Sequence, residues 1–140
     1  MKDVWSTIQC IIALVGGGLG HFIGGCDGVV ITLVVFVVTD YLTGVLCAIS
    51  DKELSSKVGF KGICRKGIIF LLVGIANILD KYVLGTGSVL RTAIAFFYIS
   101  NEGVSLLENA GHLGLPIPGK LKLVLKQLHE RAEENEEEEK

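Results

Sequence analysis

The feature that most constrains the fold is a long apolar run that contains one charged residue. Between Val29 and Ser50 only Asp40 carries a charge at neutral pH, within the stretch VVFVVTDYLTGVL. A helix needs roughly 20 apolar residues to cross a hydrocarbon layer about 30 Å thick. Half of the 140 residues are hydrophobic, which is unusual for a soluble domain of this size. The run therefore predicts a membrane-spanning helix over residues 29–50.

Three further segments have a similar character. Residues 4–26 carry no formal charge when His21 is neutral, and residues 67–84 are charged only near their end. Residues 88–110 form the most polar segment, because they include Arg91, Glu102 and Glu108. The start of the chain does not favour a cleaved signal peptide, since Asp3 follows Lys2 and no small-residue cleavage site is seen. We expect an all-α, polytopic membrane helix bundle of three to four transmembrane helices, within a transmembrane domain of residues 1–112.

Glycines recur in the first segment at intervals of four residues. Gly16, Gly20, Gly24 and Gly28 would share one face of a continuous helix, and such faces let helices approach closely in lipid. This spacing predicts a packing or oligomerisation ridge. The alternative is that the run from Gly16 to Gly18 breaks the helix and forms an interfacial hairpin. The N-terminus lies inside the cell if this segment spans the membrane and outside if it does not.

Basic residues indicate the orientation. They gather in the connection between the second and third segments and again after Pro118, and both regions should therefore be cytoplasmic. Two spans separate these regions, which is the even number that this assignment requires, and the C-terminus is then cytoplasmic. Because Ser55, Ser56, Gly59 and Gly62 favour turns, we expect the connection to be a break between helices. The cytoplasmic basic loop comprises Lys52, Lys57, Lys61, Arg65 and Lys66.

The C-terminal region should leave the bilayer after Gly111. Residues 113–131 predict a cytoplasmic segment in which an extended piece at Pro116 and Pro118 is followed by a short amphipathic helix. It could lie on the inner membrane surface or pack on the cytoplasmic loop, and the pattern fits both positions. Residues 132–140 are a run of acidic side chains that predicts a solvated, disordered tail.

The sequence contains no recognisable constellation for catalysis. No nucleophile motif, phosphate-binding loop or dinucleotide fingerprint is present, and the four cysteines form no C-x-x-C pair. We therefore expect no enzyme activity, no catalytic residue, no cofactor, no metal and no nucleic-acid partner. An intramembrane hydrolase that uses Asp40 and Asp80 is disfavoured, because shared-proton carboxylate chemistry needs adjacent groups. Asp40 falls mid-helix, whereas Asp80 falls near a helix end.

Polar and small residues align on the faces of the predicted helices. Ionisable groups at membrane depth are costly, so they face the interior of a bundle or water and tend to be functional. One stripe, suited to helix packing or oligomerisation, comprises Asp40, Gly44 and Ala48. A second stripe, predicted as a polar seam or the lining of a membrane lesion, comprises Arg91, Tyr98, Glu102, Ser105 and Asn109. The alternative is that such groups form static pairs, such as Arg91 with Asp80.

Two strings carry a specific resemblance. DYLTGVLCAISDKELSSKVGFKGICRKG and FYISNEGVSLLENAGHLGLPIPGKL cover much of the chain in order and resemble the phage holin family that includes clostridial toxin-secretion holins. The resemblance implies a protein of the bacterial cytoplasmic membrane that forms a homo-oligomer and opens lesions in the lipid bilayer. It implies release of an endolysin or a toxin without required direct contact with that cargo. A non-lytic small channel or an assembly scaffold is the alternative.

Overall fold

The computed structural model describes residues 1–124 and 127, and this part of the chain contains helices and no strand. Four long helices follow one another as α1 (Lys2–Phe22), α2 (Gly28–Ser50), α3 (Ser56–Leu79) and α4 (Val89–His112). A π-helical turn, η1 (Asp80–Leu84), continues α3. The all-α prediction is therefore confirmed for the described part of the chain.

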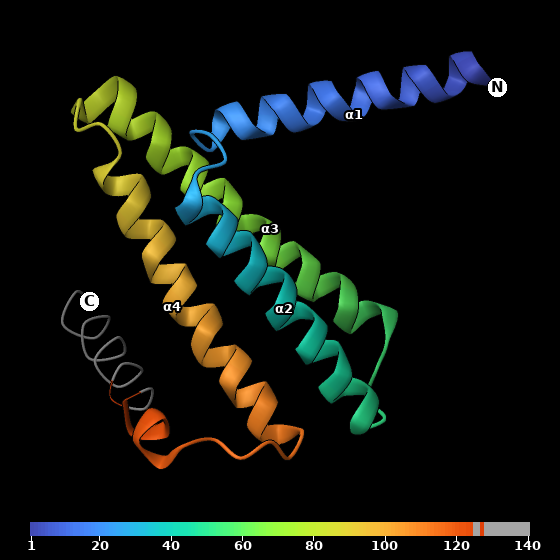
Figure 1. Ribbon diagram of the computed structural model, residues 1–140, viewed down its shortest axis with the longest axis vertical. Helices are drawn as coiled ribbons and strands as arrows, with labels where there is room; N and C mark the ends of the chain where they lie inside the picture. The colour runs from blue at the N-terminus through green and yellow to red at the C-terminus, as the bar shows by residue number, and fades with distance from the viewer. Residues whose placement is uncertain (125–126, 128–140) are drawn as a thin grey trace.

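Helices α2, α3 and α4 pack side by side, whereas α1 points away from them (Figure 1). Contacts between distant residues give the directions: Arg91 at the start of α4 meets Asp27 before α2, and His112 at the end of α4 meets Asp51 after α2. Helix α4 thus runs parallel to α2, and α3, which connects them in the chain, runs in the opposite direction. The common core consists of Leu33, Val37, Ile69, Val73 and Ala95.

In the described part of the chain, three helical segments are long and apolar enough to cross a membrane by length and composition. They are Lys2–Phe22, Gly28–Ser50 and Ser56–Leu84, the last of which includes η1. Helix α4 is not among them, in keeping with its polar inner side. Most large apolar side chains of the bundle point outward, including Ile31, Val35, Leu71, Phe96 and Phe97. This surface suits lipid, because lipid chains supply the apolar environment that water cannot.

The structure corrects the predicted break over residues 51–66. Helix α3 begins at Ser56, not at residue 67, because the Ser55 hydroxyl accepts a hydrogen bond from the Val58 amide at 3.2 Å. Ser55 is therefore an N-cap, the position that serine favours at a helix start. Gly59 and Gly62 lie inside the helix, where the absence of a side chain lets the Tyr41 ring of α2 approach.

The structure also corrects the predicted glycine ridge. Gly16 and Gly20 lie on α1, but the helix ends at Phe22, Gly24 lies in the following turn, and Gly28 begins α2. Gly24 and Gly25 have φ values of 88° and 98°, which only glycine adopts readily, so a continuous helix cannot pass through them. The four glycines therefore do not share one helix face.

The α2–α3 connection and residues 119–124, which include Lys120 and Lys122, lie at the same end of the bundle (Figure 1). Residues 113–118, after α4, are not helical, and residues 119–124 are helical again. The rest of the predicted 113–131 helix, apart from residue 127, lies outside the described residues, as does the acidic 132–140 segment.

Candidate functional site

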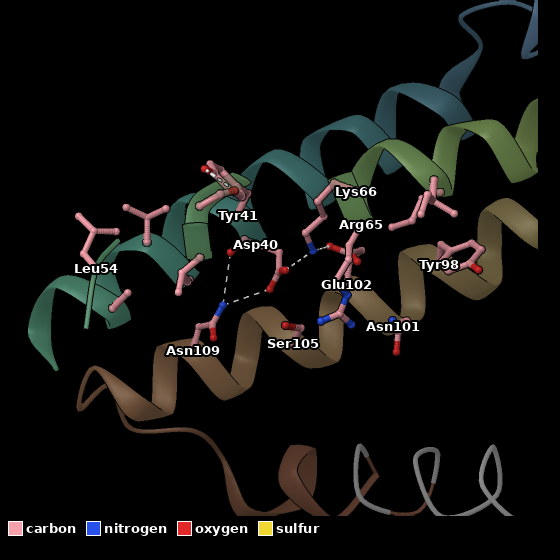
Figure 2. A pocket seen from close by; sticks show the side chains of 17 residues that line it. Asp40, Tyr41, Leu54, Arg65, Lys66, Tyr98, Asn101, Glu102, Ser105 and Asn109 are labelled. Atoms are coloured by element: carbon pink, nitrogen blue, oxygen red, sulfur yellow. Dashed lines mark hydrogen bonds and ion pairs between the residues drawn. The ribbon is translucent and has the colours of Figure 1, made fainter. Parts of the chain in front are cut away.

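An ionic cluster lies between α2, α3 and α4, with a lysine at its centre. The ammonium group of Lys66 on α3 forms ion pairs with the carboxylates of Asp40 on α2 and Glu102 on α4. Figure 2 shows the lysine side chain reaching between the two acidic groups. The Asp40 and Glu102 side chains are 7% and 4% exposed, so the surrounding helices bury both carboxylates almost completely.

The cluster carries an unequal charge count. When all three groups are ionised, two carboxylates face one ammonium, and the formal sum is −1. Burial of ions is expensive, and attraction between them compensates only when the geometry is good and the remaining polar atoms are satisfied. Lys66 serves both carboxylates at once and thereby ties the three helices together. The cluster is therefore a structural junction whose stability depends on all three charges.

Asn109 on α4 completes the hydrogen bonding of Asp40. Its amide nitrogen donates to Asp40 Oδ1 at 3.1 Å, to Thr43 Oγ1 at 3.0 Å and, more weakly, to the Asp40 carbonyl at 3.4 Å. The Cys47 thiol in turn donates to the Asn109 carbonyl at 3.5 Å. Because Asp40 Oδ2 receives Lys66, both carboxylate oxygens are occupied. Among the described residues, no buried side-chain nitrogen or oxygen lacks a partner.

A cavity of about 540 Å³ adjoins the cluster. Its wall combines the charged groups with small residues of α2 and with polar residues of α4 (Figure 2). Apolar residues, among them Val45, Leu54 and Ile69, complete this wall. The lining includes Asp40, Gly44, Ala48, Arg65, Lys66, Tyr98, Glu102, Ser105 and Asn109.

A second polar centre lies at the opposite end of the bundle, around Arg91. This side chain is only 3% exposed. Its guanidinium donates to the Asp27 carboxylate at 2.8 and 3.3 Å, to the Gly25 carbonyl at 3.0 Å and to the Ile23 carbonyl. The hydrogen bond from Arg91 is the main reason that the pKa of the Asp27 carboxyl lies below its ordinary value. Arg91 therefore holds the α1–α2 turn against α4.

The predicted pairing of Arg91 with Asp80 is wrong for the side chains. Asp80 accepts hydrogen bonds from the backbone amides of Leu90 and Arg91 at 3.1 and 2.8 Å, and from the Thr86 hydroxyl at 2.7 Å. It thus caps the start of α4, where orphan amides and the helix dipole favour a carboxylate. Since Asp40 and Asp80 have separate partners at different places, they form no carboxylate pair for hydrolysis.

The polar stripe predicted on α4 shares one side of the helix in the structure. Arg91 and Glu102 are buried, and Tyr98, Ser105 and Asn109 are partly buried and face the other helices. Arg91 belongs to the turn end, whereas Tyr98, Glu102, Ser105 and Asn109 line the cavity. The stripe Asp40, Gly44 and Ala48 also lines this cavity, so it packs within the chain. A Cβ on Gly44 would lie 3.8 Å from Asn109.

The basic loop separates into two kinds of residue. Only Lys52 lies in the α2–α3 connection, because Lys57, Lys61, Arg65 and Lys66 belong to α3, where a loop was predicted. The first four are exposed, whereas Lys66 turns inward. The signal that could have placed Lys66 inward was its spacing from the buried residues of α3. With a helix that starts at Ser56, Lys66 shares a face with the buried residues Ile69, Val73 and Asn77. The assumption of a break before residue 67 concealed this pattern.

Comparison with known proteins adds an independent line of evidence. Residues 17–130 match the model of the Bacteriophage holin family. An uncharacterised 14.9 kDa protein of Clostridium perfringens is 43% identical over 131 residues, covering 94% of this chain and 99% of that protein. An uncharacterised protein of Listeria monocytogenes is 42% identical, covering 87% of this chain and 86% of that protein.

A phage protein also resembles this chain. It is a probable holin of Bacillus phage phi105, 40% identical over 86 residues, which cover 61% of this chain and 63% of the phage protein. No solved structure matches. The matched region of the family model includes α2, α3, α4 and both polar centres.

Proposed function

Because this chain belongs to the bacteriophage holin family, we propose that it oligomerises in the bacterial cytoplasmic membrane and opens lesions that release an endolysin or a toxin. The observation that carries the proposal is the family match over residues 17–130. The ionic cluster inside the bundle supports it, since ionisable groups at membrane depth are costly and tend to be functional. The cargo needs no direct contact with this protein, because a sufficiently large lesion admits it.

The proposed topology follows the distribution of basic residues. Lys52, Lys57 and Lys61 lie at the end of the bundle where the chain leaves α4, and we assign this end and the C-terminus to the cytoplasm. The turn around Arg91 then faces outward. Helix α4 crosses beside α2 and α3, with Arg91 and Glu102 buried, Phe96 and Phe97 directed toward lipid, and Glu108 exposed in the last turns of the helix.

In the closed state, the monomer shields its own charges. Asp40, Lys66 and Glu102 compensate one another, and Asn109 satisfies the remaining oxygen of Asp40. A bilayer can accommodate this unit, because these three charged groups have protein partners and most of the outer surface is apolar. Accumulation of closed monomers therefore leaves the membrane sealed.

In the open state, the same polar surfaces line water. Separation of α4 from α2 and α3 exposes Glu102, Ser105 and Asn109, and hydration replaces the ion pairs that are lost. Neighbouring copies cover the apolar sides, so the open state depends on protein concentration. A difference of a few kcal/mol between the two states is sufficient for mass action to select the open one above a critical density.

Controlled expression in bacteria tests this proposal. Membrane potential and the extracellular activity of a cytoplasmic muralytic enzyme are followed after induction, with the amount of membrane-inserted protein measured in parallel. We expect a delay, then abrupt depolarisation, then release of the enzyme. Sealed membranes at high expression would refute the proposal, and depolarisation without protein release would assign the chain to a non-lytic channel.

A further inference from the structure

The turn between α1 and α2 fixes the direction of α1. The Asn77 amide donates to the Phe22 carbonyl at 2.9 Å, and Arg91 binds the carbonyls of Ile23 and Gly25. The Phe22 ring lies directly against Gly74 of α3. These contacts hold the last turn of α1 to the bundle by both polar and apolar groups. From this anchor α1 extends away from α2, α3 and α4 (Figure 1).

No residue of α1 is buried by the rest of the chain. A span would have to lie alongside the bundle axis, which α1 does not do (Figure 1). To reach that position, the chain would have to rotate about residues 23–27 and break the Arg91 and Asn77 hydrogen bonds. The anchored turn therefore opposes the spanning arrangement that the length and composition of α1 would otherwise allow.

The two sides of α1 differ in chemistry. At 100° per residue, most large apolar side chains fall on one side, which comprises Val4, Trp5, Ile8, Ile11, Ile12, Val15 and Leu19, whereas Leu14 falls outside it. The opposite side holds polar and small residues, including Lys2, Ser6, Gln9, Cys10, Ala13, Gly17 and Gly20. A helix with such sides is typical of the boundary between lipid headgroups and acyl chains. Trp5 suits this boundary as well, since tryptophan is enriched there.

We propose that α1 is an interfacial arm that lies along the membrane surface at the end of the bundle marked by Arg91. Its large apolar side enters the acyl region, and its polar and small side faces water. At 1.5 Å per residue, the arm covers about 30 Å of membrane surface beside the bundle. The surface assignment is independent of lysis; only the statement that this surface is the outer one rests on the orientation proposed above.

Thiol labelling in intact cells tests the arm, because the chain has its own cysteines in useful places. Variants retain one of Cys10, Cys26 or Cys64, with serine at the other three positions. A further variant carries Ile11→Cys and serine at all four native cysteines. Cys10 lies on the polar side of α1, and Ile11, 100° further round, lies within the apolar side. Because the two are neighbours in sequence, they are matched for position along the helix. A membrane-impermeant maleimide is added before the membrane potential falls.

We expect the Cys10 variant to label from outside at a rate close to that of the Cys26 variant. The Ile11→Cys variant should label about tenfold more slowly, because an apolar surrounding disfavours the reactive thiolate. Protection of both positions from both sides would show that α1 spans the membrane and would overturn the proposal. Equal, rapid labelling of both would show that α1 is free of lipid and would also overturn it. The Cys64 variant reports the orientation separately, since it should label only after permeabilisation.

Discussion

The side-chain amide of Asn109 donates to the Asp40 carboxylate at 3.1 Å across the α2–α4 interface, although 69 residues separate the two in sequence. The contact occupies the carboxylate oxygen that Lys66 leaves free. Asn109 therefore joins a hydrogen-bonded interface to an ionic cluster, and it links the stability of the closed bundle to its charged groups.

Substitution of Asn109 should weaken the α2–α4 contact. Asn109→Leu removes the hydrogen bonds to Asp40 and Thr43, and hydrogen bonds between membrane helices contribute about 0.6 kcal/mol each on average. We expect a loss of about 1–2 kcal/mol in the free energy of unfolding of the detergent-solubilised protein. Asn101→Leu is the matched control, because Asn101 lies on the same helix at the exposed edge of the cavity, where its side chain makes no contact with Asp40. Equal effects of the two substitutions would contradict the role of Asn109.

Removal of the central lysine should have a larger effect. Lys66→Met leaves Asp40 and Glu102 buried without their cation, and loss of one partner from a buried ion pair typically costs about 3–5 kcal/mol. We expect depolarisation to occur earlier at a given amount of membrane-inserted protein. Lys61→Met is the control, since Lys61 is exposed on the same helix.

A second substitution separates charge from packing at the same site. Glu102→Gln in the Lys66→Met background removes one of the two unpaired carboxylate charges, and it should restore part of the lost stability and of the delay. Unfolding in detergent measures the first quantity, and the onset of depolarisation measures the second. If the double variant is no better than Lys66→Met, electrostatic compensation is not what the lysine provides.

The anchor of α1 depends on the absence of a side chain at Gly74, which leaves room for the Phe22 ring. A Cβ at this position would overlap the Phe22 ring, so Gly74→Ala must displace that ring. Overpacking typically destabilises by about 1–3 kcal/mol. Gly67→Ala, at a helical position with open space, should be neutral or stabilise by up to about 1 kcal/mol. Hydrogen exchange of amides 23–27 should accelerate in the first variant only, and unchanged exchange there would contradict the packing role of Phe22.

The contact between Asp27 and Arg91 predicts a pH dependence. The folded-state pKa of Asp27 lies below the ordinary 3.8, because Arg91 hydrogen-bonds to the carboxylate. Its contribution to stability is therefore fully present above pH 3.8 and is lost as pH falls through the lower, folded-state value. The difference in melting temperature between the parent and Asp27→Asn should be constant near neutral pH and should shrink in strong acid. A difference that grew on acidification would have the wrong sign.

Much of the fold was readable from hydropathy and spacing, because lipid imposes strict requirements. A run with Asp40 as its only charged residue has few alternatives to a membrane helix, and the polar stripe of α4 followed from three-and-four spacing. The exact helix ends were harder to predict. Ser55 suits a turn as well as an N-cap, and Gly59 suits a turn as well as a helix interior. The hydrogen bond from the Val58 amide to Ser55 and the approach of Tyr41 to Gly59 and Gly62 distinguish the two in the structure.

The composition of the ionic cluster could not be read from the sequence. Asp40 and Glu102 were expected on inward faces, but the choice of Lys66 as their partner depends on how far α3 extends and on the rotation of three helices. The same holds for Arg91, whose side chain selects Asp27 while its backbone amide selects Asp80. Pairings across 60 or more residues follow from packing, which a local pattern does not encode.

The most direct test of the account is the wetting of the bundle interior during lesion formation. Ser105→Cys and Phe97→Cys are placed separately in a chain whose four native cysteines are serine, because Ser105 lines the cavity and Phe97 faces outward. A small thiol reagent that crosses membranes, and that reacts with thiolates in contact with water, is applied before and after depolarisation. We expect labelling of the Ser105→Cys variant to accelerate about tenfold after depolarisation, as water reaches the thiolate. Labelling of the Phe97→Cys variant should stay slow. Release of the muralytic enzyme with no change at Ser105→Cys would contradict the account.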